Sequence, residues 1–226
     1  MVHRSPIDRH ETRFALQLLR NQLEQRVYPV HRLDKPTSGI LLFALNPVTA
    51  RLLAYQFAAH AVAKSYLAIV RGWCPEQGLI DHPLREEQDQ ADPAMRQQPS
   101  RVQAAVTDFQ RLATVELDVA VDRYPHARYS LVLLKPITGR RHQLRRHMKH
   151  ISHPIIGDAN HGKGVHNRFF QQAFSCHRLL LANVAMRLRH PHNGEELRLM
   201  AAPGTDFVTV AARLGWEAAL LPPIGP

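Results

Sequence analysis

Apolar residues along the chain recur at two spacings, which predict strands and a few helices. Residues 39–46 (GILLFALN) form a short apolar run typical of a buried strand. Asn46 and Pro47 then match a helix N-cap followed by a first helical residue. Apolar side chains continue at helical spacing, so an amphipathic helix is expected over residues 47–61. The apolar positions of this helix are Leu52, Leu53, Phe57 and Ala61.

Three later segments carry β-branched, aromatic or alternating residues and predict strands. These segments are residues 64–73, 102–115 and 127–137. Strands outnumber helices and only one βαβ unit stands out, so the expected fold class is α+β with a mixed, mainly antiparallel sheet. Residues 85–101 are polar and contain two prolines, which predicts a surface loop between strands. Turn formers in the final segment, LLPPIGP, are expected to close the domain.

The charge of the chain is strongly positive. Lys and Arg number 29 against 19 Asp and Glu, which gives a net charge of +10 with the 15 histidines neutral. This favours a polyanionic partner, nucleic acid first and an anionic membrane second. No apolar run reaches the roughly 18 residues of a membrane span, and the first residues lack the apolar segment of a signal peptide. A soluble cytoplasmic protein without membrane contact is expected.

Neither the cysteines nor the histidines predict a metal site. Cys74 and Cys176 lie far apart and match neither a disulfide framework nor CxxC zinc spacing. The segment HMKHISHP, residues 147–154, has histidines at every third position but no carboxylate or thiolate. Arg and Lys crowd these histidines, and their charge would repel a dication, so no metal is expected.

The densest positive charge lies in TGRRHQLRRHMKH, residues 138–150, which contain no acid. A helix is expected here with Thr138 as its N-cap and with Leu144, Met148 and Ile151 along one apolar face. Like charges one turn apart destabilise a helix, so we expect a phosphate backbone or a buried acid to relieve them. The basic side chains are Arg140, Arg141, Arg145, Arg146 and Lys149.

A single acid, Asp34, stands among basic residues in HRLDKPTSGILLFALN, residues 31–46. Thr37 and Ser38 can donate hydrogen bonds toward this carboxylate, and Gly39 allows a sharp turn. A carboxylate held at the end of a rigid strand suits catalysis, and an arginine of the basic segment would favour its charged form. An ordinary charged turn is the alternative interpretation of these residues alone.

Three segments together resemble, in order and spacing, the signature motifs of the RluA family of pseudouridine synthases. They are HRLDKPTSGILLFALN, KSYLAIVRG and TGRRHQLRRHMKHISHPIIGD. The resemblance implies one catalytic domain over residues 1–226 with the pseudouridine synthase fold, whose mainly antiparallel central sheet is flanked by helices and loops. Family members usually begin with a strand and a KPxGxxVHRS-like segment. This chain starts at MVHRS, so we expect that first strand to be missing.

The resemblance also implies which residues act on the uridine. Asp34 matches the catalytic aspartate. This aspartate could attack C1′ or C6 of the nucleotide, or it could remove the proton from C2′, and the sequence does not choose between these routes. Arg145 matches the basic residue that pairs with this aspartate. Tyr66 matches the tyrosine that stacks on the flipped base and is a candidate for removing the proton from C5. The reaction consumes nothing, so neither a metal nor a nucleotide cofactor is implied.

The same resemblance implies residues that bind the RNA. Arg32 matches the arginine that enters the helical stack where the base has left, and Leu144 would pack against the base. Without the resemblance, Tyr66 and Leu144 are equally typical of core residues. The other expected substrate-binding residues are Thr37, Arg140, Arg141 and Arg146.

Further stretches, including HPIIGDANHGKGVHNR, resemble the TruC branch of the family, which isomerises uridine-65 of certain transfer RNAs. RNA, and transfer RNA first, is therefore the expected partner, and no obligate protein partner is implied. A ribosomal RNA target is an alternative, as is a non-catalytic RNA-binding protein on the same fold. A hydrolase built on Asp34 ranks last, because the usual glycosidase needs a second carboxylate that the motifs do not offer.

Overall fold

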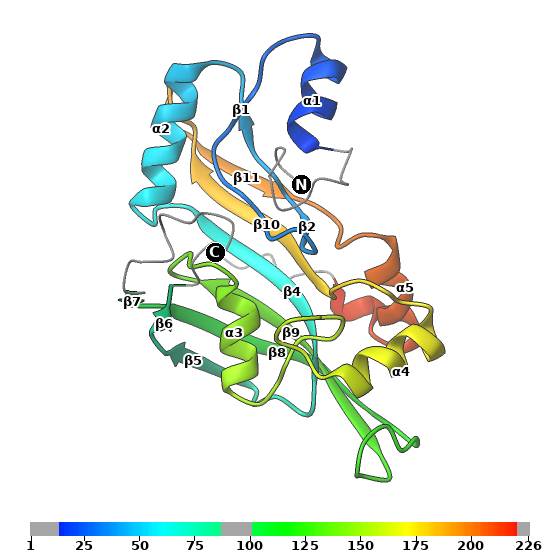
Figure 1. The fold of residues 1–226 in the computed structure, drawn as a ribbon. Helices are drawn as coiled ribbons and strands as arrows, with labels where there is room; N and C mark the ends of the chain where they lie inside the picture. The colour runs from blue at the N-terminus through cyan, green and yellow to red at the C-terminus, as the bar shows by residue number, and fades with distance from the viewer. Residues whose placement is uncertain (1–13, 87–100, 221–226) are drawn as a thin grey trace, which may run out of the picture.

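The computed structural model describes residues 14–86 and 101–220 (Figure 1). The expectations for the N-terminal segment before residue 14 and for the turn-forming tail after residue 220 lie outside the described residues. The same holds for residues 87–100, which make up most of the expected surface loop. The strands that flank these residues, β6 (Leu84–Arg85) and β7 (Val102–Gln103), pair with each other.

A seven-stranded sheet forms the centre of the molecule. Its strands follow the order β11-β10-β4-β9-β8-β5, and β2 pairs with β10 beside this path. Only the β2–β10 pair is parallel among the strand pairs of the described residues. The mixed, mainly antiparallel sheet expected from the sequence is therefore confirmed. The strands are β2 (Ser38–Gly39), β4 (Ala63–Arg71), β5 (Gln77–Asp81), β8 (Val106–Leu117), β9 (Ala127–Pro136), β10 (Leu181–Arg189) and β11 (Glu196–Met200).

Helices and two small sheets accompany this central sheet. The helices are α1 (Ala15–Leu23), α2 (Pro47–Ala58), α3 (Gln143–His150), α4 (Gly164–Phe174) and α5 (Thr205–Arg213), followed by a 3-10 helix, η2 (Glu217–Leu220). One small sheet pairs β1 (Tyr28–Pro29) with β3 (Phe43–Ala44), and the other pairs β6 with β7. Within the described residues, no helix has the length and apolar character that a lipid bilayer requires.

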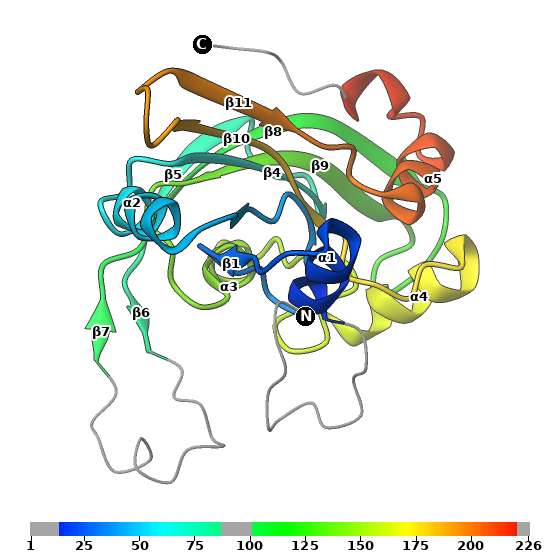
Figure 2. The same cartoon turned by 90° about the horizontal axis from the view of Figure 1, so that it is seen from above.

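Both faces of the central sheet are buried, because helices cover each of them. On one face, Leu67 of β4 belongs to a cluster with Phe170 of α4 and Phe207 of α5. On the other face, its neighbour Ala68 belongs to a cluster with Met148 of α3. Figure 2 shows α3 lying beneath the arch of the sheet. Each fully buried side chain of the size of Leu or Phe contributes about 1.5–3 kcal/mol, so one cluster fixes α4 and α5 to one face of the sheet and the other fixes α3 to the opposite face.

The apolar run 39–46 is not the single strand that its pattern predicts. The chain instead pairs with β10 at β2, leaves it, and pairs with β1 at β3. Gly39 has φ +107°, and a Cβ at this position would lie 2.0 Å from the carbonyl oxygen of Asn183. Only glycine accommodates this close approach of two backbones, so Gly39 divides the run between two sheets.

The helix expected over residues 47–61 is present with a shorter C-terminal end. The N-cap is confirmed, because the Asn46 side chain accepts a 2.8 Å hydrogen bond from the Thr49 N–H. The helix ends at Ala58, since His60 adopts a left-handed conformation with φ 56°. The predicted apolar face is also narrower than expected: Leu53 is buried, whereas Leu52 is 37% exposed.

The strands expected at residues 64–73 and 127–137 are confirmed within about two residues as β4 and β9. The prediction of a single strand over residues 102–115 is wrong, because the segment is divided into β7 and β8. The chain interrupts it at Ala104 and Ala105, because β7 leaves the central sheet to pair with β6.

Two histidines with lowered pKa values make stability depend on pH. Burial, aided by the charge of Lys64, lowers the pKa of His31 to about 4, and the His31 Nε2 accepts a 2.9 Å hydrogen bond from the Leu42 N–H. Burial, aided by neighbouring cations, also lowers the pKa of His166 to about 4. Unfolded histidine titrates near 6.5, so between these values the unfolded chain binds protons that the folded protein does not.

We therefore expect the free energy of unfolding to fall by about 2 kcal/mol for each of these histidines between pH 7 and pH 5. Urea unfolding at pH 7, 6 and 5 measures this loss. The His166→Gln variant should lose about 2 kcal/mol less than the wild type over the same range. An equally steep loss in that variant would contradict the assignment to His166.

Candidate active site

Asp34 lies in the loop between β1 and β2. The backbone N–H of Thr37 donates a 2.9 Å hydrogen bond to the backbone carbonyl of Asp34 and closes a turn. The Ser38 hydroxyl does not point toward the Asp34 carboxylate as expected. It donates instead to the backbone carbonyls of Leu181, at 3.5 Å, and Pro203, at 3.4 Å. Ser38 thus ties the loop to β10. The Asp34 side chain, on the same loop, is 23% exposed.

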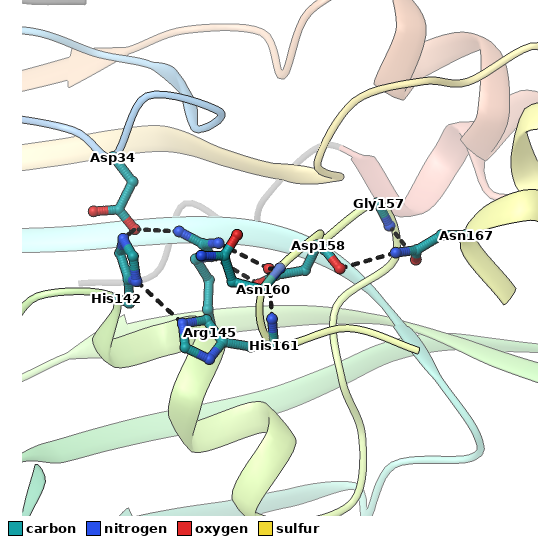
Figure 3. Close-up of polar contacts among 8 residues, drawn as sticks. All are labelled: Asp34, His142, Arg145, Gly157, Asp158, Asn160, His161 and Asn167. Carbon is teal, nitrogen blue, oxygen red and sulfur yellow. Dashed lines mark hydrogen bonds and ion pairs between the residues drawn. The ribbon is translucent and has the colours of Figure 1, made fainter. Parts of the chain in front are cut away.

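The Arg145 guanidinium lies between two carboxylates (Figure 3). Its Nη1 donates to Asp34 Oδ2 at 3.3 Å. Its Nε and Nη2 donate to the two oxygens of Asp158 at 2.7 and 2.8 Å, in the bidentate geometry that makes such pairs strong. Arg145 is 3% exposed and Asp158 is 2% exposed. Asp158 therefore holds the guanidinium in place, and the guanidinium in turn orients Asp34.

Sequence reasoning did not single out Asp158, although it anticipated a buried acid near the basic segment. Asp158 is the first acid after that segment. The backbone N–H groups of Asn160 and His161 each donate to its Oδ1 at 2.9 Å. Asn167 of α4 binds the flanking backbone, accepting from the Gly157 N–H and donating to the Asp158 carbonyl, both at 2.8 Å. The position of Asp158 is therefore fixed from several sides.

These contacts keep the buried pair ionised. Burial by itself would raise the pKa of Asp158, but the hydrogen bonds from Arg145 and the His161 N–H lower it below its usual range. Burial by itself would lower the pKa of Arg145, but the hydrogen bonds and charge of Asp158, with a further contribution from Asp34, raise it. The site therefore contains one permanent buried cation between two acids.

A pocket of about 470 Å³ opens beside Asp34, a volume within the usual range for ligand sites. Seven of the expected site residues line it: Arg32, Asp34, Thr37, Tyr66, Arg140, Leu144 and Arg145. Arg141 and Arg146 were also expected at the site, but they are not among the described residues that line this pocket. Other lining residues, which sequence reasoning did not assign to the site, include His31, Phe57, His60, Lys64 and His142, and they come from the β1–β2 loop, α2, the connection after α2, β4 and the N-cap of α3.

The pKa values of Tyr66 and Lys64, which both line the pocket, are shifted by burial. Burial raises the pKa of Tyr66, and the charge of Asp34 raises it further, so the phenol stays neutral at physiological pH. Burial lowers the pKa of Lys64, which lies two residues earlier on the same strand. A larger cavity of about 850 Å³ runs along α1 and residues 24–29, but it lies away from the Asp34–Arg145–Asp158 cluster. We therefore take the smaller pocket as the candidate active site.

The basic helix begins later than its sequence predicts, and Thr138 is not its N-cap. The Thr138 hydroxyl instead accepts from the Val106 N–H at 2.9 Å and donates to the Gln143 side chain at 2.7 Å. The N-cap is His142, which adopts a left-handed conformation with φ 53°. The predicted apolar face is confirmed, because Leu144 and Met148 are buried. Arg145, one of the basic side chains of this segment, points inward to its two acids, and a buried acid is one of the two partners expected to relieve the positive charge.

Comparisons with known proteins agree with this geometry. Residues 1–150 match the sequence profile of the RNA pseudouridylate synthase family. A Vibrio cholerae protein named tRNA pseudouridine synthase C is 45% identical over 221 residues, which cover 98% of this chain and 91% of that protein. A Yersinia pestis protein of the same name is 47% identical over 96% of this chain and 84% of its own.

Solved structures give the same result. Human RNA Pseudouridylate Synthase Domain Containing 1 superposes with a TM-score of 0.67 at 25% identity, covering 91% of this chain and 78% of that one. Human RNA Pseudouridylate Synthase Domain Containing 4 superposes with a TM-score of 0.66 at 25% identity, covering 88% of this chain and 80% of that one.

Proposed function

The chain belongs to the RNA pseudouridylate synthase family, and we propose that it converts uridine-65 of transfer RNA to pseudouridine. Its enzyme class, an isomerase that makes pseudouridine, follows from that membership. Similarity over nearly the whole chain to proteins named tRNA pseudouridine synthase C carries the choice of transfer RNA. Residues 1–226 then act as a single catalytic domain, in the cytoplasm with the substrate.

The base has to leave its helix before it can be isomerised. A uridine in an RNA stem is stacked and paired, so flipping it out costs a few kcal/mol. Arg32, which is exposed at the pocket, fills the gap in the stack. Inside the pocket, Tyr66 gives the flipped base a stacking surface worth roughly 1–3 kcal/mol, and Leu144 packs against it.

Asp34 then acts on the flipped nucleotide. It attacks C1′ or C6, or it removes the proton from C2′; each route needs a carboxylate of fixed orientation beside the nucleotide. The 3.3 Å hydrogen bond from Arg145 supports this role, because it fixes one carboxylate oxygen. Around the pocket, Arg140, Arg141 and Arg146 contribute affinity for the phosphate backbone without reading its sequence.

The proposal is tested by mapping pseudouridines in total RNA from cells with and without the gene. Loss confined to position 65 of transfer RNA is the expected result. Loss confined to ribosomal RNA would overturn the choice of substrate. If no pseudouridine were lost although the purified protein bound RNA, a binding role without catalysis would replace the proposal.

A further inference from the structure

The imidazole of His142 faces Asp34 from the start of α3. Its Nε2 lies 4.0 Å from Asp34 Oδ2, and the side chain is 14% exposed in the wall of the pocket. The residue adopts φ 53°, a left-handed conformation that is uncommon outside glycine, although histidine and asparagine adopt it more readily than most residues. Backbone outliers of this kind cluster at functional sites, so the placement of His142 calls for a chemical explanation.

A second imidazole, that of His161, lies on the side of the His142 ring that faces away from Asp34 (Figure 3). His142 Nδ1 is 3.1 Å from His161 Nε2, and the two rings meet edge to face. The His161 backbone N–H donates to Asp158, so the carboxylate that orients Arg145 also fixes His161. With Nδ1 engaged by His161, the Nε2 of His142 is the ring nitrogen that faces Asp34 and the pocket.

The isomerisation requires a proton acceptor in this pocket. The bond between C1′ and N1 breaks, and a bond between C1′ and C5 forms. C5 then carries both C1′ and its original hydrogen, which must leave as a proton while N1 gains one. Tyr66 is a weak acceptor, because its phenol is neutral and burial raises its pKa. In the routes through the ribose, Asp34 has left the sugar by this stage; a neutral imidazole is ordinarily a stronger base than a carboxylate, so a histidine suits this step better.

We propose that His142 Nε2 accepts the C5 proton, an inference that rests on the proposed function. The electron pair of the C5–H bond restores the C5–C6 double bond, and the electrons of the C6–N1 double bond move to N1. The protonated His142 then returns a proton to N1, so protons and electrons balance. His161 is a positioning residue, which accepts a hydrogen bond from His142 Nδ1–H and stabilises the imidazolium.

Several ionisable groups surround His142. The ionisable groups that share the pocket with His142 are His31, Arg32, Asp34, His60, Lys64, Tyr66, Arg140 and Arg145. His161 contacts its other ring nitrogen.

The test compares His142→Asn with the wild type in single-turnover reactions. Asparagine tolerates the left-handed backbone but is not a base. We expect pseudouridine formation to slow about 100-fold or more. RNA carrying deuterium at C5 of uridine should react more slowly than ordinary RNA in the variant. The isotope effect, which is the ratio of the two rates, should be larger in the variant than in the wild type. His150→Gln, on the exposed side of the same helix, is the matched control and should keep the wild-type rate.

A second variant, His161→Phe, tests the positioning role. Phenylalanine keeps a ring at this position but removes the acceptor for His142 Nδ1–H, so the imidazolium loses a hydrogen bond. The rate should fall about tenfold. The acid limb of the pH–rate profile should move to lower pH, which a purely structural role would not cause. An unmoved limb would overturn the role of His161.

Total RNA from cells that lack the gene is the substrate, so the rate is measured on whichever RNA the wild type modifies. A wild-type rate in folded His142→Asn, without a larger isotope effect, would overturn this inference and leave the proposed function standing. Absence of any pseudouridine with the wild-type protein would overturn the proposed function and the inference with it. Circular dichroism and RNA binding confirm that each variant is folded.

Discussion

Asp34→Asn should abolish pseudouridine formation, with a loss on the order of 10⁴-fold or more, while RNA binding persists. Asparagine has nearly the same shape as aspartate, but its amide is neither a nucleophile nor a base. It can still accept the hydrogen bond that Arg145 donates at 3.3 Å, so the loop should keep its place. The RNA-binding surface is made by other side chains, and its affinity should change little.

Single-turnover pseudouridine formation and RNA binding, measured on the same preparations, check this result. Asp81→Asn is the matched control, because Asp81 is an exposed aspartate on β5 and lies outside the pocket. Turnover within tenfold of the wild type in Asp34→Asn would remove Asp34 from the reaction. Loss of RNA binding would instead indicate that the carboxylate mainly organises the surface.

Asp158→Asn should lower the free energy of unfolding by about 3–5 kcal/mol. The substitution removes the charge that neutralises Arg145, whose guanidinium would remain buried between a neutral amide and the more distant Asp34. An uncompensated buried charge is among the most destabilising changes a protein core can undergo. Activity should fall as well, because the guanidinium is then free to move away from its present contact with Asp34.

A double variant separates these two effects. Arg145→Met combined with Asp158→Leu replaces the ion pair by apolar side chains, and most of the lost stability should return. Activity should stay low, because Asp34 has lost the donor that orients it. Urea unfolding measures the four members of this cycle. Glu116→Gln, which breaks an exposed ion pair with Arg128, should cost at most about 1 kcal/mol and serves as the reference.

The sequence allowed the family, the sheet type and much of the pocket to be predicted, because these depend on local patterns and on short motifs. β4 and β9 follow from their alternation and composition, and the N-cap at Asn46 follows from its side chain. The motif segments also predicted Asp34, Tyr66 and Arg145 as site residues, and the three residues line one pocket.

The features that escaped prediction depend on contacts between distant parts of the chain. Gly39 divides an apolar run because Asn183 approaches it from β10, and nothing in the run itself records that approach. Asp158 pairs with Arg145 across a loop whose shape the sequence does not reveal. The delayed start of α3 depends on Val106, which binds Thr138 and draws it away from the helix.

The pairing of β2 with β10 has a consequence for the order in which the protein is made and folds. Ser38 and its partner Leu181 are 143 residues apart in the chain, whereas β8 and β9 are close neighbours that can form a hairpin early. During synthesis the N-terminal part emerges first, so the loop that carries Asp34 waits for β10 before it can be anchored. Arg145 and Asp158 also emerge long after Asp34. The nascent chain can therefore anchor Asp34 beside Arg145 and Asp158 only after β10 has been synthesised.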